Sequence, residues 1–190
     1  MEFTPDNKEV QDVPFFKDAT ARGGWAGYAS RKSTEKLQSE VKEAISLLGG
    51  TVTGFMKGTF AGKHPRDGYH VHYIMQSPNG MVQGKMEVAA LPVEKPKHFY
   101  GTRAEKTYKK QREESLKMAL FMLRDSLKGM WYLQQLSPGF AALMPFMIAN
   151  ESGETISQLW SRQDTFANLL PPGEANFETD VIEGDYQEAE

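Results

Sequence analysis

The sequence contains no cysteine in 190 residues. This absence excludes a disulfide framework, a thiolate metal site and a cysteine nucleophile. The chain also has no run of 18 apolar residues, and it does not begin with a charged segment followed by an apolar one. Neither a membrane-spanning helix nor a secretory signal is therefore expected. A soluble cytoplasmic protein that contacts no membrane is the simplest interpretation.

Recognisable catalytic motifs are absent as well. There is no Gly-x-Ser-x-Gly elbow to expose a serine nucleophile and no Walker loop to hold a nucleotide phosphate. Carboxylates are concentrated near the C-terminal end, where a flexible chain would not keep the constant separation that paired acid and base chemistry requires. The sequence favours a non-catalytic protein, and no cofactor is expected.

Apolar residues make up 39% of the chain and include 11 Phe, 7 Tyr and 3 Trp, enough to fill the core of one domain. We place this domain at residues 21–170. Residues 1–20 are acidic and without a sustained period, and they are interpreted as a flexible arm. Residues 171–190 hold seven acidic residues, no basic ones and few apolar ones. A disordered acidic tail is expected there.

Apolar periodicity predicts the elements of the domain. Spacing of three and four residues predicts an amphipathic helix at residues 33–48, a long one at about 102–136 and a short terminal one within 154–170. Runs rich in Val, Thr and aromatic residues predict three strands, and a tight hairpin turn at residues 78–80 is expected to join the last two. These strands are expected at residues 51–60, 69–77 and 81–90. The predicted fold class is α+β, with a three-stranded antiparallel meander packed by the N-terminal helix and the long helix.

Charge is unevenly distributed along the chain. The total is −3, yet residues 21–150 hold 19 basic and 10 acidic side chains, whereas residues 151–190 hold 1 basic and 10 acidic side chains. The basic body predicts a surface that binds a polyanion. The acidic end predicts a segment that competes for that surface or recruits a basic partner protein.

The candidate binding residues combine cations with aromatic rings. In the long helix, basic side chains recur on one strip beside the apolar face, at about 100° per residue. Glycines near Trp25 and Tyr28 would let these rings and Arg22 stack on bases. An ordinary solvated helix face, and a loop whose rings fill the core, are the alternatives. The predicted nucleic-acid-binding residues are Arg22, Trp25, Tyr28, Lys57, Lys63, Arg66, Lys95, Lys97, Arg103, Lys106, Lys110, Lys117, Arg124 and Lys128.

His70 and His72 are two residues apart, so both imidazoles would point to one face of a strand, as two metal ligands would. A metal-dependent enzyme using this pair is one alternative function, although no third ligand is evident nearby. A structural role is another interpretation. Contact with a nucleic-acid backbone, strengthened below neutral pH, is a third.

A protein-interaction adaptor or assembly component is a further alternative. Its contact surface would combine Phe15 and Phe16 with exposed Met or Trp side chains between residues 130 and 148. A salt-insensitive oligomer without affinity for nucleic acid would favour this function.

Two resemblances bear on these alternatives. The order helix, three strands, helix over residues 33–130 is similar to the double-stranded-RNA-binding domain. That family carries a Lys-Lys-x-x-Ala-Lys cluster, which residues 109–114 replace with Lys-Lys-Gln-Arg-Glu-Glu, and we do not assign the chain to it. The acidic residues 177–190 resemble the tails of bacterial single-stranded-DNA-binding proteins and of some phage annealing proteins, without their terminal Pro-Phe. This resemblance implies recruitment of a partner protein.

Taken together, the cations and interspersed rings favour a non-catalytic protein that binds single-stranded DNA or RNA. No motif for reading a duplex is present. An accessory role in replication or recombination of a bacterium or its phage is the leading hypothesis.

Overall fold

The computed structural model describes residues 13–25, 31–62, 64–77, 80–96, 102–137 and 141–161. The acidic tail predicted at residues 171–190 lies outside these ranges. Within them, no helix is both long enough and apolar enough to cross a bilayer.

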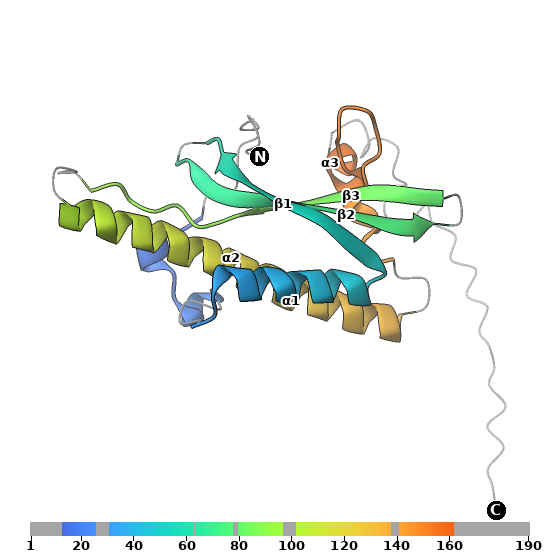
Figure 1. Cartoon of the computed structure of the whole chain (residues 1–190), viewed down its shortest axis with the longest axis horizontal. Helices are drawn as coiled ribbons and strands as arrows, with labels where there is room; N and C mark the ends of the chain where they lie inside the picture. The colour runs from blue at the N-terminus through green and yellow to red at the C-terminus, as the bar shows by residue number, and fades with distance from the viewer. Residues whose placement is uncertain are drawn as a thin grey trace, which may run out of the picture.

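The sheet has three antiparallel strands in the order β1-β2-β3 (Figure 1). They are β1 (Gly50–Phe60), β2 (Arg66–Ser77) and β3 (Gly80–Ala89). The register of β1 against β2 shifts between Val52 and Gly54, as in a β-bulge. Ser77 pairs with Gly80, so a two-residue connection joins β2 and β3, as the hairpin signal predicted.

Two helices cover one face of this sheet. They are α1 (Thr34–Leu47) and α2 (Thr102–Leu136), which lie side by side below the strands (Figure 1). Ser33 caps α1 by accepting a hydrogen bond from the Lys36 backbone N–H at 3.2 Å, and Gly49 follows its end with φ +88°. These bounds agree with the periodicity to within a few residues and confirm the predicted α+β fold.

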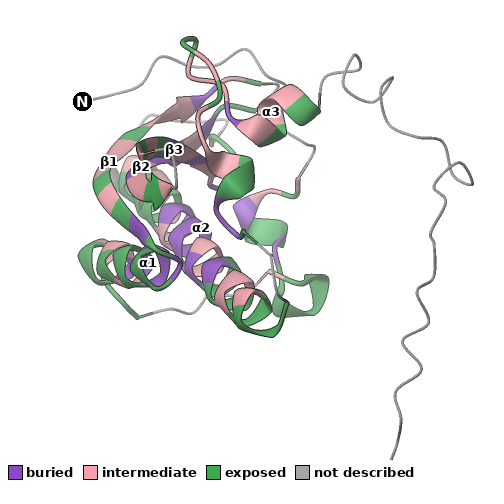
Figure 2. Cartoon of the chain, turned by 90° about the vertical axis from the view of Figure 1, so that its right-hand side faces the viewer, coloured by how far each residue is buried: buried purple, intermediate pink, exposed green. Residues whose placement is uncertain are grey.

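The main core lies between the helices and the sheet. The buried positions of α2 face α1 and the strands (Figure 2). Alternate residues of β2 point into this core, so the intervening ones point to the opposite face of the sheet. Fully buried members include Leu37, Val41 and Ile45 of α1, Val71 and Tyr73 of β2, and Leu120 and Leu127 of α2.

The N-terminal segment packs on another side of α2. It contains two short 3-10 helices, η1 (Phe16–Asp18) and η2 (Ala21–Gly23). Phe16 and Ala19 join Leu91 and Met118 in a second buried cluster, and the Phe16 backbone N–H donates to the Pro92 carbonyl at 2.9 Å. Residues 13–20 are therefore packed against the body of the domain.

The C-terminal elements attach to the sheet at its edge strand β3. They are η3 (Met144–Phe146) and α3 (Ile156–Trp160), and α3 lies on the side of the sheet opposite α1 and α2 (Figure 1). The Ile148 backbone N–H donates to the Gln83 carbonyl at 2.9 Å, which attaches this segment to β3. The short helix predicted within residues 154–170 thus begins at Ile156.

Candidate nucleic-acid interface

Two adjacent cavities open between the sheet and the N-terminal half of α2. Their volumes are about 200 Å³ and about 450 Å³. Asp67 of β2 and Arg112 of α2 line both, so this pair stands at the boundary between them. We call the two cavities together the Asp67–Arg112 groove.

The Asp67–Arg112 pair connects the start of β2 to α2. Arg112 Nε donates to Asp67 Oδ2 at 2.6 Å and Arg112 Nη2 donates to Oδ1, a two-pronged geometry that fixes both planar groups. The Asp67 side chain is 9% exposed and the Arg112 side chain 43%. The hydrogen bond to Asp67 raises the pKa of Arg112 above its usual value. The guanidinium is therefore held in place while part of it faces solvent.

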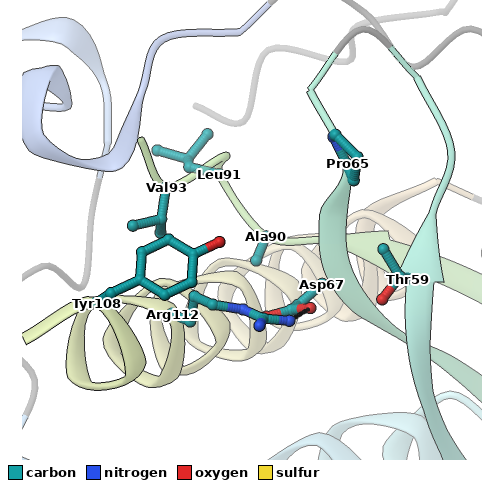
Figure 3. Close-up of a pocket in the computed structure, with 8 residues that line it drawn as sticks. All are labelled: Thr59, Pro65, Asp67, Ala90, Leu91, Val93, Tyr108 and Arg112. Atoms are coloured by element: carbon teal, nitrogen blue, oxygen red, sulfur yellow. Dashed lines mark hydrogen bonds and ion pairs between the residues drawn. The ribbon is translucent and has the colours of Figure 1, made fainter. Parts of the chain in front are cut away.

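Polar and apolar side chains both line the smaller cavity, and most of its exposed surface is polar. Its lining residues other than the pair are Thr59, Pro65, Ala90, Leu91, Val93 and Tyr108 (Figure 3). The Tyr108 ring centroid lies 5.6 Å from the Arg112 guanidinium carbon, and the ring forms one side of the cavity.

The larger cavity brings together charges of both signs. Lys57 of β1 and Lys109 of α2 are exposed at its rim, and Tyr69 forms part of its wall. Burial raises the pKa of Tyr69 above its usual value. Glu35 and Glu113 also line this cavity, which makes the groove itself nearly charge-balanced. Net positive charge must come from residues around it.

Of the predicted basic residues, Lys57 lines this groove, and Lys109, which was not predicted, lines it as well. Arg103, Lys106 and Lys110 are exposed on the N-terminal part of α2. We call Lys57, Arg103, Lys106, Lys109 and Lys110 together the proximal basic cluster. Within it, Lys109 Nζ lies 2.6 Å from Glu105 Oε1 and Lys110 Nζ lies 3.8 Å from Glu114 Oε1. Surface pairs of this kind contribute roughly 0.3–0.5 kcal/mol and exchange readily with another anion.

Two predicted residues are instead part of the folded core. Arg66 is 9% exposed, and its Nε donates to the Ala90 carbonyl at 2.6 Å. Arg124 is 7% exposed, and its Nη1 donates to Glu40 Oε2 of α1 at 2.6 Å. Lys117 is three-quarters buried and lies 3.2 Å from Glu113. The strip predicted along α2 is therefore interrupted at Lys117 and Arg124.

The other predicted residues lie apart from the groove lining. Trp25 packs against the second buried cluster, in agreement with the core-filling alternative. Arg22 is exposed on η2, and Lys95 is exposed after β3. Lys128 is exposed about 27 Å along α2 from Lys110, at 1.5 Å per residue. Tyr28, Lys63 and Lys97 lie outside the described residues.

The sequence analysis did not select Lys109, Arg112 or Asp67 as binding residues. Lys109 and Arg112 are three apart and so share one helix face, which is the signal available in the sequence. Asp67 gives no such signal, because its partner is 45 residues away in the chain.

The two histidines lie on the sheet face opposite α1 and α2. Their ring centroids are 6.3 Å apart, and His70 Nε2 lies 3.7 Å from Glu87 Oε1. Burial and the nearby Lys85 lower the pKa of His72. Among the residues that the structure describes, no group of three or more His, Cys, Asp or Glu is placed to hold a metal ion. The described part of the chain therefore gives the histidine pair no third ligand.

Comparison of the chain with protein-family models, with curated proteins and with solved structures found no match in any of the three.

Proposed function

We propose that this protein binds single-stranded nucleic acid at the Asp67–Arg112 groove, as a non-catalytic accessory factor in replication or recombination. The observation that carries the proposal is the convergence of Lys57 from β1 with Lys109 and Arg112 from α2 at one open groove. Cations from separate elements give phosphates several contact points, and Tyr108 adds aromatic surface beside them.

The shape of the groove favours an open strand over a duplex. A cavity of about 200 Å³ admits single side groups, such as one unstacked base, and excludes a double helix. Stacking on an aromatic ring contributes about 1–3 kcal/mol per base when the base is free of its partner. The near balance of charge inside the groove implies modest affinity that depends strongly on the surrounding cluster and on salt.

The salt dependence of binding tests the proposal. Changing Lys57, Lys106 and Lys109 together to Ala is expected to reduce the slope of log K against log salt by about 2, because each lost single-strand phosphate contact removes about 0.7. The measurement is fluorescence anisotropy with a labelled dT15 strand over a salt series. The matched control changes Arg22, Lys42 and Lys128 to Ala, removing the same charge from exposed positions outside the groove.

Two results would contradict the proposal. Equal slopes for both triple variants would mean that the charges act only through the net charge of the protein. If the unmodified protein binds neither single-stranded DNA nor RNA nor duplex DNA at low salt, the proposal that it binds nucleic acid is wrong.

We also propose that the acidic residues 171–190 compete with nucleic acid for the groove. Removing them is expected to tighten binding of dT15 at low salt, with the difference vanishing at high salt as the tail charges are screened. A full-length variant whose seven tail carboxylates are changed to amides separates charge from chain length. If the unmodified protein, the truncated protein and the amide variant bind dT15 equally at low salt, the tail does not compete for the groove. Recruitment of a partner protein would then be its remaining predicted role.

A second candidate function is an interaction module, favoured by apolar side chains at the C-terminal end of α2. Tyr132, Leu133 and Leu136 are 61%, 53% and 80% exposed. Phe16 is buried and so is not available as the adaptor hypothesis required, whereas Phe15 is half-buried and packs edge-on against His64. A salt-insensitive oligomer that binds no nucleic acid would select this function.

A further inference from the structure

One stripe along α2 is covered by the rest of the domain only at its beginning. Residues spaced alternately by three and four share a narrow arc of a helix, at about 100° per residue. The residues of this stripe are Ser115, Met118, Met122, Ser126, Gly129, Leu133 and Leu136. Met118 is 1% exposed and packs against Phe16 of the N-terminal segment. The last four residues are exposed, and we call them the exposed α2 stripe.

The surface around this stripe is apolar and without charge. Leu133 and Leu136 are more than half exposed, and so is Tyr132 beside them. Residues 129–150 contain no Asp, Glu, Lys, Arg or His. Asp125, which flanks the stripe, already accepts a hydrogen bond from Arg124 Nε at 2.9 Å. Depletion of charge together with exposed aromatic and aliphatic side chains is typical of the centre of a protein interface.

Gly129 lies within this stripe at a position where the fold does not require glycine. A Cβ built there would meet no atom of the described residues within 4 Å. Glycine inside a helix is nevertheless destabilising relative to alanine. A missing side chain lets another backbone approach closely, and the neighbouring Ser126 is small as well. The two residues therefore fit the crossing point of a second helix.

We infer that the exposed α2 stripe packs against the same stripe of a second copy of this chain, around a two-fold axis near Gly129. Charge favours this occupant. Residues 21–150 hold 19 basic and 10 acidic side chains, all of them before residue 129, so two copies repel each other over much of their surface. At the stripe they meet without opposed like charges. Residues 1–20 and 151–190 are acidic and would place carboxylates on a surface that offers them no cation.

This dimer names the partner of the interaction surface and leaves the Asp67–Arg112 groove open. Arg112 lies about 32 Å along α2 from Leu133, at 1.5 Å per residue. Two grooves would thus be carried away from the contact, one in each copy. Because association is measured without nucleic acid, its failure would leave the proposed function intact, and failure of nucleic-acid binding would leave the dimer intact.

Sedimentation of nuclease-treated protein over a concentration series tests the dimer. The unmodified chain is expected to change from monomer to dimer with increasing concentration, and added salt should not weaken the association, because the contact contains no charge to screen. Leu133→Lys should raise the dissociation constant by about tenfold or more. Its control is Met81→Lys, which places the same charge at an apolar residue that is 59% exposed on β3 and should leave the constant unchanged.

A monomer at every concentration up to about 1 mM would overturn the inference. The stripe would then be left for another protein, or for part of this chain outside the described residues, to cover. Equal dissociation constants for Leu133→Lys and Met81→Lys would also overturn it, because the dimer would then use a different surface.

Two further variants locate the helix crossing. Gly129→Leu adds apolar surface, so unspecific association would become tighter, whereas a close crossing is blocked and the dissociation constant should rise. Because the chain has no cysteine, Ser126→Cys can be linked by a short bis-maleimide without interference. Lys128→Cys, exposed on the other side of the same helix, is its control and should not be linked. Tighter association of Gly129→Leu, or equal linking of the two cysteine variants, would overturn the crossing.

Discussion

Gly84→Ala is expected to lower the free energy of unfolding by about 3 kcal/mol, near the upper end of overpacking effects. A Cβ built on Gly84 would overlap the Cζ, Cε2 and hydroxyl oxygen of Tyr73, well inside the 3.0 Å that real Cβ atoms keep. The two residues face each other across β2 and β3. The glycine is therefore required by the position of the tyrosine ring.

Tyr73 has no space into which it can move. It is 1% exposed, and its hydroxyl donates to the Leu143 carbonyl at 3.1 Å. Burial raises the pKa of this phenol far above its usual value, so the donor is retained at any ordinary pH. Displacing the ring would break this hydrogen bond and loosen the attachment of η3 and α3 to β3.

Gly54→Ala is the matched control for this prediction. Gly54 also lies in the sheet, and a Cβ there would meet no atom within 4 Å. Both substitutions restrict the unfolded chain equally, so their difference reports the clash with Tyr73. Urea denaturation of the two variants measures it. Equal midpoints would show that the space beside Tyr73 is larger than the structure indicates.

Arg124→Met is expected to cost about 2 kcal/mol, although its charge was predicted to face nucleic acid. Arg124 Nη1 lies 2.6 Å from Glu40 Oε2, and the guanidinium carbon lies 4.1 Å from the Phe121 ring centroid. Breaking a fully buried pair costs roughly 3–5 kcal/mol. The expected cost of Arg124→Met is lower, because Lys32 Nζ lies 2.6 Å from Glu40 Oε1 and still balances the charge of that carboxylate.

Lys128→Met is the control, since Lys128 is exposed one turn further along α2. Its substitution removes the same charge and is expected to change the free energy of unfolding by less than about 0.5 kcal/mol. Similar losses in both variants would mean that the contact between α1 and α2 does not depend on Arg124.

The pH dependence of stability gives a separate readout of this ion pair. Hydrogen bonds from Lys32 and Arg124 lower the pKa of Glu40 from 4.5 to about 2. A lowered pKa means that the contribution is complete above pH 4.5 and is lost as the pH falls from there through about 2. Urea midpoints measured across that window should therefore fall less steeply in Glu40→Gln than in the unmodified protein. Parallel curves would show that Glu40 titrates normally.

The elements of this fold were predictable because the signals for them are local. Leu37, Val41 and Ile45 repeat at helical spacing, and the observed α1 spans Thr34–Leu47. Alternation around Val71 and Tyr73 predicted a half-buried strand, and β2 includes both residues. In each case, residues only a few positions apart in the sequence decide which face of the helix or strand is apolar.

The candidate site was predictable only in part. Lys57, Lys106 and Lys110 were selected by charge; Lys57 lines the groove, whereas Lys106 and Lys110 are exposed on α2 outside its lining. Arg124 shares the angular position of Lys117 and Lys128 on α2, so periodicity assigned it to the same strip. The carboxylate that removes it from the strip belongs to α1, and nothing near residue 124 in the sequence indicates that Glu40 lies there.

The sequence by itself determined the helices, the strands and the sign of the charge on each segment, because these depend on residues close together in the chain. Tertiary packing decided which cations are available to a ligand. Asp67 and Arg112 meet only because the start of β2 lies against α2, and Arg124 turns inward only because α1 packs beside it. Whether a basic side chain finds a buried acceptor is set by how the elements are arranged in space, and neighbours in the sequence do not show it.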